Sequence, residues 1–129
     1  MTIRVIVVDD HEVVRRGLAS IFAEEGIEIV AEATSGEEAL KVIDKTEADL
    51  VLMDIRMPEG DGLNAMGRIK LEKPDLPVLM LSTYDNPTYV ARAVALGAAG
   101  YILKGPSRDD LLAAIRTAAS GENAWTREE

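Results

Sequence analysis

Short apolar runs alternate with segments of helical periodicity along almost the whole chain, and this alternation limits the possible folds more than any other feature. Strand-like runs are expected at Ile3–Val8, Ile27–Ala33, Leu50–Met53, Val78–Leu81 and Tyr101–Leu103. Between these runs, apolar residues recur every three or four positions, as they do on one face of a helix. Strands that alternate with helices pair in parallel through right-handed crossovers, so helices should cover both faces of a single sheet.

Helix start and stop signals divide the remaining segments into five helices. Ser35 with Glu38, and Ser107 with Asp110, have the spacing of a capping box. Pro87 suits the first turn of a helix, and glycines follow the first and last helical patterns. The sequence therefore predicts five strands and five helices.

The second strand differs from the others because it keeps polar residues at alternate positions. Glu28 and Glu32 interrupt the apolar residues of Ile27–Ala33, whereas the other runs are almost continuously apolar. Continuous apolar strands suit a sheet that is covered on both faces, and a half-polar strand suits an edge. The predicted fold is therefore α/β, with a flavodoxin-like doubly wound sheet of five parallel strands in the order 2-1-3-4-5.

Three carboxylates follow the two strands that this order places side by side. Asp9 and Asp10 follow the first strand, and Asp54 follows the third. Ligands of open α/β sheets bind at such a crossing point, beyond the carboxyl ends of the strands. Like charges gathered there oppose folding unless a cation compensates them. Because the chain has no cysteine and one histidine, the available ligands are hard oxygens, which favour Mg2+, with Mn2+ as the alternative.

Two further strand ends supply a hydroxyl group and an ammonium group. Ser82 follows the fourth strand, and Lys104 follows the fifth. Both groups can contact phosphate oxygens. Together with a metal, they describe a site that receives a phosphoryl group. Asp54 is the predicted nucleophile, because it stands alone on its loop and aspartates do form aspartyl phosphates.

The charge of the chain excludes one class of function. Its 129 residues are the length of one domain, and 23 acidic residues against 14 basic ones give a formal net charge of -9. This is the wrong sign for a chain that must neutralise nucleic-acid phosphates. No apolar run approaches the length of a membrane span, so we expect no membrane contact and a cytoplasmic location.

Four short motifs carry a resemblance to a known family. They are "VVDD" ending at Asp10, "MDIRMPEGDG" around Asp54, "LSTYD" at Ser82 and "GYILK" ending at Lys104. With them, the chain resembles the receiver domain of two-component response regulators over essentially its whole length. "DDHEVVRRGL" and "ALGAAGYILK" are most similar to the NarL/LuxR-type branch, whose receivers usually precede a helix-turn-helix output domain.

The resemblance implies a role for each candidate residue. Asp10 would bind Mg2+ directly, and Asp9 would bind it through water. Asp54 would accept the phosphoryl group and also bind the metal, together with the main-chain carbonyl of Arg56. Ser82 would supply the switch hydroxyl, Tyr101 the switch aromatic ring, and Lys104 the lysine of the family pattern.

The resemblance also implies partners and a division of the chain. A sensor histidine kinase would donate the phosphoryl group, and the chain would act as a signalling switch rather than an enzyme, with at most slow self-dephosphorylation. Residues 1–121 would form the receiver, and residues 122–129 a tail or the start of a linker to a missing output domain. DNA binding and transcription regulation would depend on that output domain. A homodimer is allowed, but the sequence identifies no surface for it.

Two other classes of function stay open, and simpler roles exist for some residues. A small phosphohydrolase would also use an aspartyl phosphate, but it needs an acid or base near the nucleophile, and Arg56 stands two residues after Asp54. A nucleotide or flavin carrier needs a glycine-rich loop where this chain has "DDHE". Asp10 alone could be a helix cap. Arg15 and Arg16 are expected to form a solvated helix face.

Overall fold

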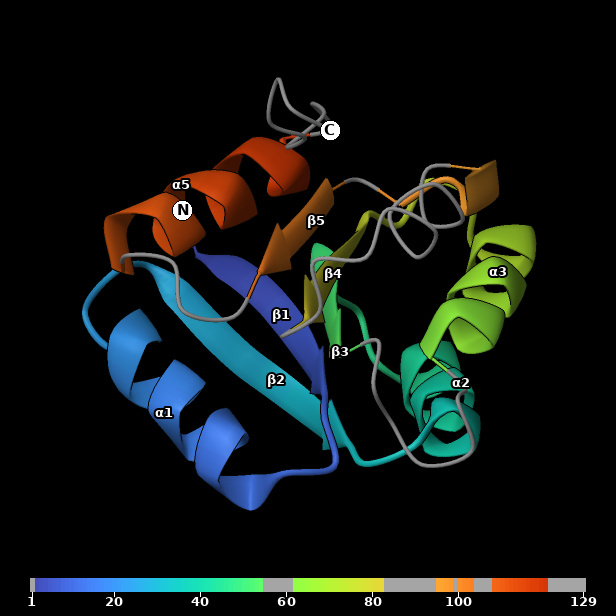
Figure 1. The fold of residues 1–129 in the computed structure, drawn as a ribbon, viewed down its shortest axis with the longest axis horizontal. Coiled ribbons are helices and arrows are strands. Elements are labelled where there is room, and N and C mark those ends of the chain that lie inside the picture. Colours follow the sequence, from blue (N-terminus) through green and yellow to red (C-terminus); the bar gives the residue numbers. More distant parts are fainter. Residues whose placement is uncertain (1, 55–61, 83–94, 99, 104–107, 121–129) are drawn as a thin grey trace.

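The computed structural model describes residues 2–54, 62–82, 95–98, 100–103 and 108–120, and these form a layered α/β domain (Figure 1). The strands are β1 (Ile3–Val8), β2 (Ile27–Ala33), β3 (Leu50–Asp54), β4 (Val78–Ser82) and β5 (Gly100–Leu103). The helices are α1 (Glu12–Phe22), α2 (Gly36–Lys45), α3 (Gly62–Glu72) and α5 (Arg108–Ala119). The predicted parallel α/β architecture is confirmed.

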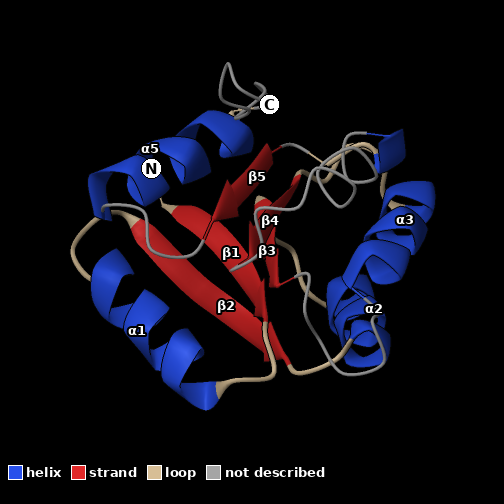
Figure 2. Ribbon diagram, in the orientation of Figure 1, coloured by secondary structure: helices blue, strands red, loops and turns tan. Residues whose placement is uncertain are grey.

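The strands form one parallel sheet in the order β2-β1-β3-β4-β5. The half-polar strand β2 lies at an edge, as its alternating pattern predicts. Helices α1 and α5 cover one face of the sheet, and α2 and α3 cover the other (Figure 2). The chain therefore moves outward from β1 to β2 and then returns to the opposite side of β1, which makes the ends of β1 and β3 a crossing point.

Two apolar cores follow from the alternation of side chains along the strands. On β1, Ile6 and Val8 pack into the core beneath α2 and α3, whereas Val5 and Val7 pack into the core beneath α1 and α5. All four side chains are at most 1% exposed. A parallel sheet whose two faces are both covered requires this kind of continuous apolar strand.

The start of α2 agrees with the predicted capping pattern. Ser35 is the N-cap of α2, and its side chain accepts a hydrogen bond from the main-chain N–H of Glu38 at 3.1 Å. Glu38 reaches back to the main-chain N–H of Thr34, at 2.6 Å, rather than to that of Ser35. Ser107 and most of the helix expected after Pro87 lie outside the described residues. Ala95 and Leu96, at the end of that expected helix, are helical.

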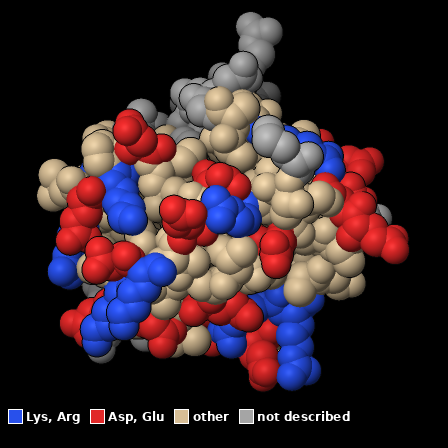
Figure 3. Space-filling model, turned by 180° about the vertical axis from the view of Figure 1, so that it is seen from behind, with Lys and Arg blue, Asp and Glu red and all other residues tan. Residues whose placement is uncertain are grey.

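The surface of the described residues carries charges of both signs. On the face drawn in Figure 3, lysine and arginine side chains are interspersed with aspartate and glutamate and do not form a continuous basic area. None of the described helices combines the length and the apolar character that crossing a bilayer requires.

Candidate functional site

The ends of β1 and β3 bring the predicted carboxylates together. Val8 of β1 is the register partner of Met53 of β3, so the next residues, Asp9 and Asp54, lie side by side. Asp54 is the last residue of β3 rather than the first residue of the loop, because its main chain still pairs with Leu81 of β4. The predicted positions of Asp9, Asp10 and Asp54 at two adjacent strand ends therefore agree with the observed register.

The carboxylates are close together, and two of them are buried. Asp9 and Asp54 are each 2% exposed, whereas the Asp10 side chain is 25% exposed. One ligand atom from each of Asp9, Asp10, His11 and Asp54 can be chosen so that all four atoms lie within 4.8 Å of one another. We call these four residues the acidic cluster. Buried carboxylates at such distances require compensation from donors or from a cation.

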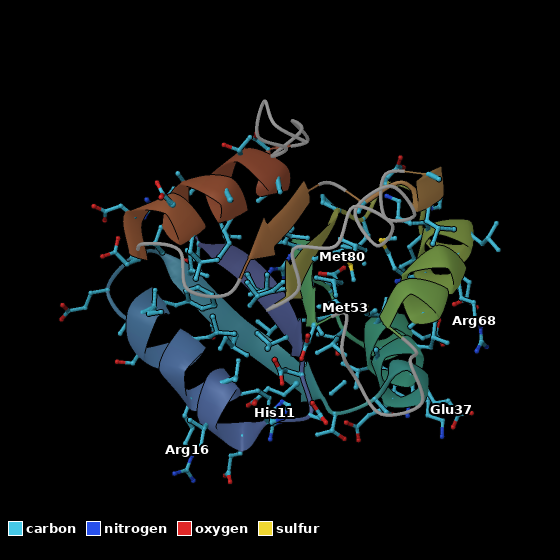
Figure 4. All side chains as sticks on the ribbon, in the orientation of Figure 1. His11, Arg16, Glu37, Met53, Arg68 and Met80 are labelled. Carbon is cyan, nitrogen blue, oxygen red and sulfur yellow. The ribbon has the colours of Figure 1, made fainter. Side chains whose placement is uncertain are left out.

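His11 supplies part of this compensation to Asp9. The main-chain N–H of His11 donates to Asp9 Oδ1 at 2.8 Å, and the ring atom Nδ1 lies 3.1 Å from the same oxygen, within hydrogen-bonding distance. The ring is at the carboxyl end of the sheet, beside the start of α1 (Figure 4). These contacts hold the Asp9 carboxylate in one orientation.

Asp10 supports the assignment of a cation site. Its Oδ1 atom is buried and accepts no hydrogen bond within the described part of the chain. His11 Nδ1 lies 2.9 Å from this atom, without hydrogen-bond geometry. A buried carboxylate oxygen of this kind, among other carboxylates, fits the oxygen ligands that Mg2+ prefers. The donor set present therefore fits the predicted metal.

The remaining predicted site residues are described only in part. Ser82 is the last residue of β4, one position beyond the partner of Asp54, so its main chain lies on the strand next to β3. Tyr101 lies in β5 opposite Met80. The side chains of Ser82 and Tyr101 lie outside the described part of the chain, as do all atoms of Arg56 and Lys104.

Sequence reasoning missed the contacts of two residues. Arg15 is not part of a solvated helix face: its side chain is 15% exposed and bonds both the loop after β1 and strand β2. Arg16 does match the expectation, since its side chain is 79% exposed, pairs with Glu12, and points away from the molecule in Figure 4. The composition alone assigns no role to His11, the single histidine. Its place two residues after Asp9, at the N-cap of α1, is a sequence signal that it can contact the Asp9 carboxylate.

Comparisons with known proteins agree with this geometry. Residues 5–116 match the family described as the response regulator receiver domain. The response regulator VraR of Staphylococcus aureus is 40% identical over 129 residues, which cover 99% of this chain and 62% of that protein. This chain thus spans less than two thirds of the length of VraR.

Solved structures of similar proteins share the whole fold. A LuxR-family two-component response regulator from Aurantimonas sp. SI85-9A1 has a TM-score of 0.91 and 28% identity, covering 98% of this chain and 90% of the other. The signal receiver domain of NarL from Mycobacterium tuberculosis has a TM-score of 0.87 and 33% identity, with coverage of 94% and 98%. On these matches and on the flavodoxin-like sheet with its acidic cluster, the chain belongs to the response regulator receiver domains, the signalling modules of two-component systems, and is similar to LuxR/NarL-type members.

Proposed function

We propose that Asp54 accepts a phosphoryl group from a sensor histidine kinase in a Mg2+-dependent reaction, and that this charge change switches the interactions of the chain. The observation that carries the proposal is the convergence of Asp9, Asp10 and Asp54 at two adjacent strand ends, with ligand atoms within 4.8 Å. Asp54 is at the crossing point of the sheet, where ligands of open α/β sheets bind.

The proposed step is a direct transfer. A carboxylate oxygen of Asp54 attacks the phosphorus atom of a phosphohistidine. A P–O bond forms as the P–N bond breaks, and the electron pair of the P–N bond returns to the imidazole nitrogen. Mg2+ held by Asp9, Asp10, Asp54 and the carbonyl of Arg56 would offset the negative charge around the phosphoryl oxygens. His11 keeps the Asp9 carboxylate oriented toward this site.

The proposed output is a change in the strands next to the site. Phosphorylation adds negative charge and strong acceptor oxygens, to which the Ser82 hydroxyl and the Lys104 ammonium group can bind. Movement of Ser82 would give space to Tyr101, on the neighbouring strand, to turn inward. The surface formed by the helix expected after Pro87, β5 and α5 would then change its affinity for a partner, including a second copy of this chain.

The rest of the proposal concerns the longer protein. We assign residues 1–121 to the receiver and residues 122–129 to a tail or linker. The similarity to VraR, which is longer than this chain, supports an output domain beyond it. Contact with DNA and control of transcription would belong to that output domain, and the cytoplasm is the proposed location.

Intact mass spectrometry after incubation with acetyl phosphate and Mg2+ tests the proposal. We expect one added phosphoryl group on the wild-type chain, and none in the presence of EDTA or in Asp54→Asn. Asp49→Asn is the matched control, because Asp49 precedes the same strand at its opposite end and accepts a hydrogen bond from the main-chain N–H of Arg4. This variant should be phosphorylated like the wild type.

Other outcomes would identify the alternatives. A phosphoryl group that persists in Asp54→Asn would overturn the assignment of Asp54. Catalytic release of phosphate from unrelated esters would indicate a phosphohydrolase, and a bound yellow chromophore would indicate a flavin carrier. A phosphorylated Ser82→Ala variant that keeps full phosphorylation-dependent association would argue against the Ser82 switch.

A further inference from the structure

Arg15 joins three parts of the molecule that are separate in sequence. It lies one turn into α1, and its Nη1 donates to the main-chain carbonyl oxygen of Asp9 at 2.6 Å. Its Nε donates to Glu32 Oε1 at 2.7 Å. The side chain therefore connects the first turn of α1, the loop that carries the acidic pair, and the edge strand β2.

The Asp9 carbonyl lies outside the main-chain hydrogen-bonding pattern of α1. Helix α1 begins at Glu12, and its first main-chain hydrogen bond runs from Arg15 N–H to the carbonyl of His11, so the Asp9 carbonyl is two positions too early for the helical pattern. The N–H of Asp9 donates to Ala33 of β2 at 3.0 Å. With Arg15, both polar groups of the Asp9 main chain are held, one by β2 and one by α1.

Glu32 limits where the guanidinium group can lie. The guanidinium is a planar group with several donors in fixed directions, so a bond at Nε and a bond at Nη1 together restrict both its position and its orientation. Glu32 stands on β2, where it is the register partner of Val7 of β1, beyond the one register shift in this pairing. Glu32 thus holds the Arg15 side chain against the sheet, and Arg15 in turn holds the Asp9 carbonyl in place.

We propose that Arg15 is a positioning residue for the metal site: it places the main chain of Asp9, and with it the carboxylates of Asp9 and Asp10, in the arrangement that binds a divalent cation. This inference rests on the proposed function. Groups that orient metal ligands without touching the metal typically change its affinity by about 10–100-fold when they are removed.

Whether replacing Arg15 weakens or strengthens the binding of a cation distinguishes a positioning role from a purely electrostatic one. Arg15 carries a positive charge beside an acidic cluster, so its removal alone should strengthen the binding of a cation. Loss of positioning should weaken that binding instead. We therefore expect Arg15→Met to raise the dissociation constant for Mn2+ about tenfold, measured in the unphosphorylated chain from the electron paramagnetic resonance signal of the free ion.

The adjacent Arg16 provides a matched control. It is on the same helix, has the same charge and bonds Glu12 in place of Asp9 and Glu32. Arg16→Met should leave the dissociation constant for Mn2+ unchanged or lower it. Glu32→Ala should weaken Mn2+ binding less than Arg15→Met does, because the guanidinium can still bond the Asp9 carbonyl. The double variant should bind Mn2+ no more weakly than Arg15→Met alone, because Glu32 acts through Arg15.

The unfolding midpoint in urea, measured on the same samples, completes the test. If Arg15→Met lowers the midpoint but binds Mn2+ like the wild type, Arg15 has only a structural role and the inference is wrong. Tighter binding in Arg15→Met would also overturn it. If that variant does not fold, Arg15→Lys replaces it: Lys keeps the charge but cannot make both bonds, and should bind Mn2+ more weakly than Arg16→Lys. A wild-type chain that binds no Mn2+ would instead contradict the proposed function.

Discussion

At the scale of single residues, the charged side chains that are buried among the described residues are Asp9 and Asp54. Burying a carboxylate is unfavourable unless donors or a cation replace the lost hydration. In this protein, both are at the carboxyl end of the sheet, together with the less buried Asp10. Stability alone does not explain why three acidic residues share this edge of the sheet, whereas the proposed metal site does.

Neutralising Asp10 should stabilise the metal-free protein. Asp10→Asn removes one of three neighbouring negative charges, so we expect the free energy of unfolding in urea with EDTA to rise by about 1 kcal/mol. Glu28→Gln is the control, because Glu28 is an exposed carboxylate on β2 outside the acidic cluster. It should change the free energy of unfolding by less than about 0.5 kcal/mol. A destabilised Asp10→Asn would show that the three charges are already compensated without metal.

Magnesium should stabilise the wild-type chain and not Asp10→Asn. A ligand that binds only the folded state adds RT ln(1 + [L]/Kd), which is about 1.4 kcal/mol at ten times the dissociation constant. Thermal unfolding with increasing MgCl2 at constant ionic strength measures this term. An equal rise in midpoint for both proteins would exclude Asp10 as a metal ligand.

The residues found from sequence and those missed differ in what determines their position. Asp9, Asp10 and Asp54 could be predicted because the ends of adjacent parallel strands always meet at one edge of the sheet. Arg15 could not, because its contacts depend on which way a long side chain turns from α1. A solvated arginine and one that reaches back over a loop have the same sequence pattern, as the neighbouring Arg16 shows.

At the scale of elements, the N-cap of α2 contributes a definable part of the stability. Ser35 Oγ satisfies the N–H of Glu38, which has no partner inside the helix. Ser35→Ala should lower the free energy of unfolding by about 1 kcal/mol. Ser20→Ala, at an exposed position within α1, should have no such cost, because Ala is the better helix former. Equal losses in the two variants would mean that the cap adds nothing.

Helix α3 depends on one face for its stability. Ile69 is 1% exposed and packs in the core beneath α2 and α3, whereas Leu71, two residues later, is 85% exposed. Ile69→Ala should lower the free energy of unfolding by about 2–5 kcal/mol through lost burial and the cavity left behind. Leu71→Ala should change it by less than about 0.5 kcal/mol. Urea denaturation of both variants checks the difference, and a similar loss in both would contradict the described orientation of α3.

At the scale of the whole molecule, the layered architecture and the edge position of β2 could be predicted because they follow from apolar patterns. Strands buried on both faces must be apolar throughout, and Glu28 and Glu32 mark β2 as the exception. The pattern does not give the length of each strand to the residue. Asp54 and Ser82 are the last residues of β3 and β4 rather than the first residues of the loops, because main-chain pairing continues regardless of side-chain polarity.

The net charge of -9 should make the stability of the molecule depend on salt. Repulsion among excess acidic groups destabilises a compact chain, and raising the ionic strength from about 0.01 M to about 0.15 M shortens the screening length from about 30 Å to about 8 Å. We therefore expect KCl to raise the thermal unfolding midpoint of the wild type and of Asp10→Asn alike, since screening acts on the whole surface. Replacing part of the KCl by MgCl2 at equal ionic strength should add a further rise in the wild type alone. A wild type whose midpoint falls with KCl would mean that the opposite charges interspersed on its surface outweigh the excess of acidic groups.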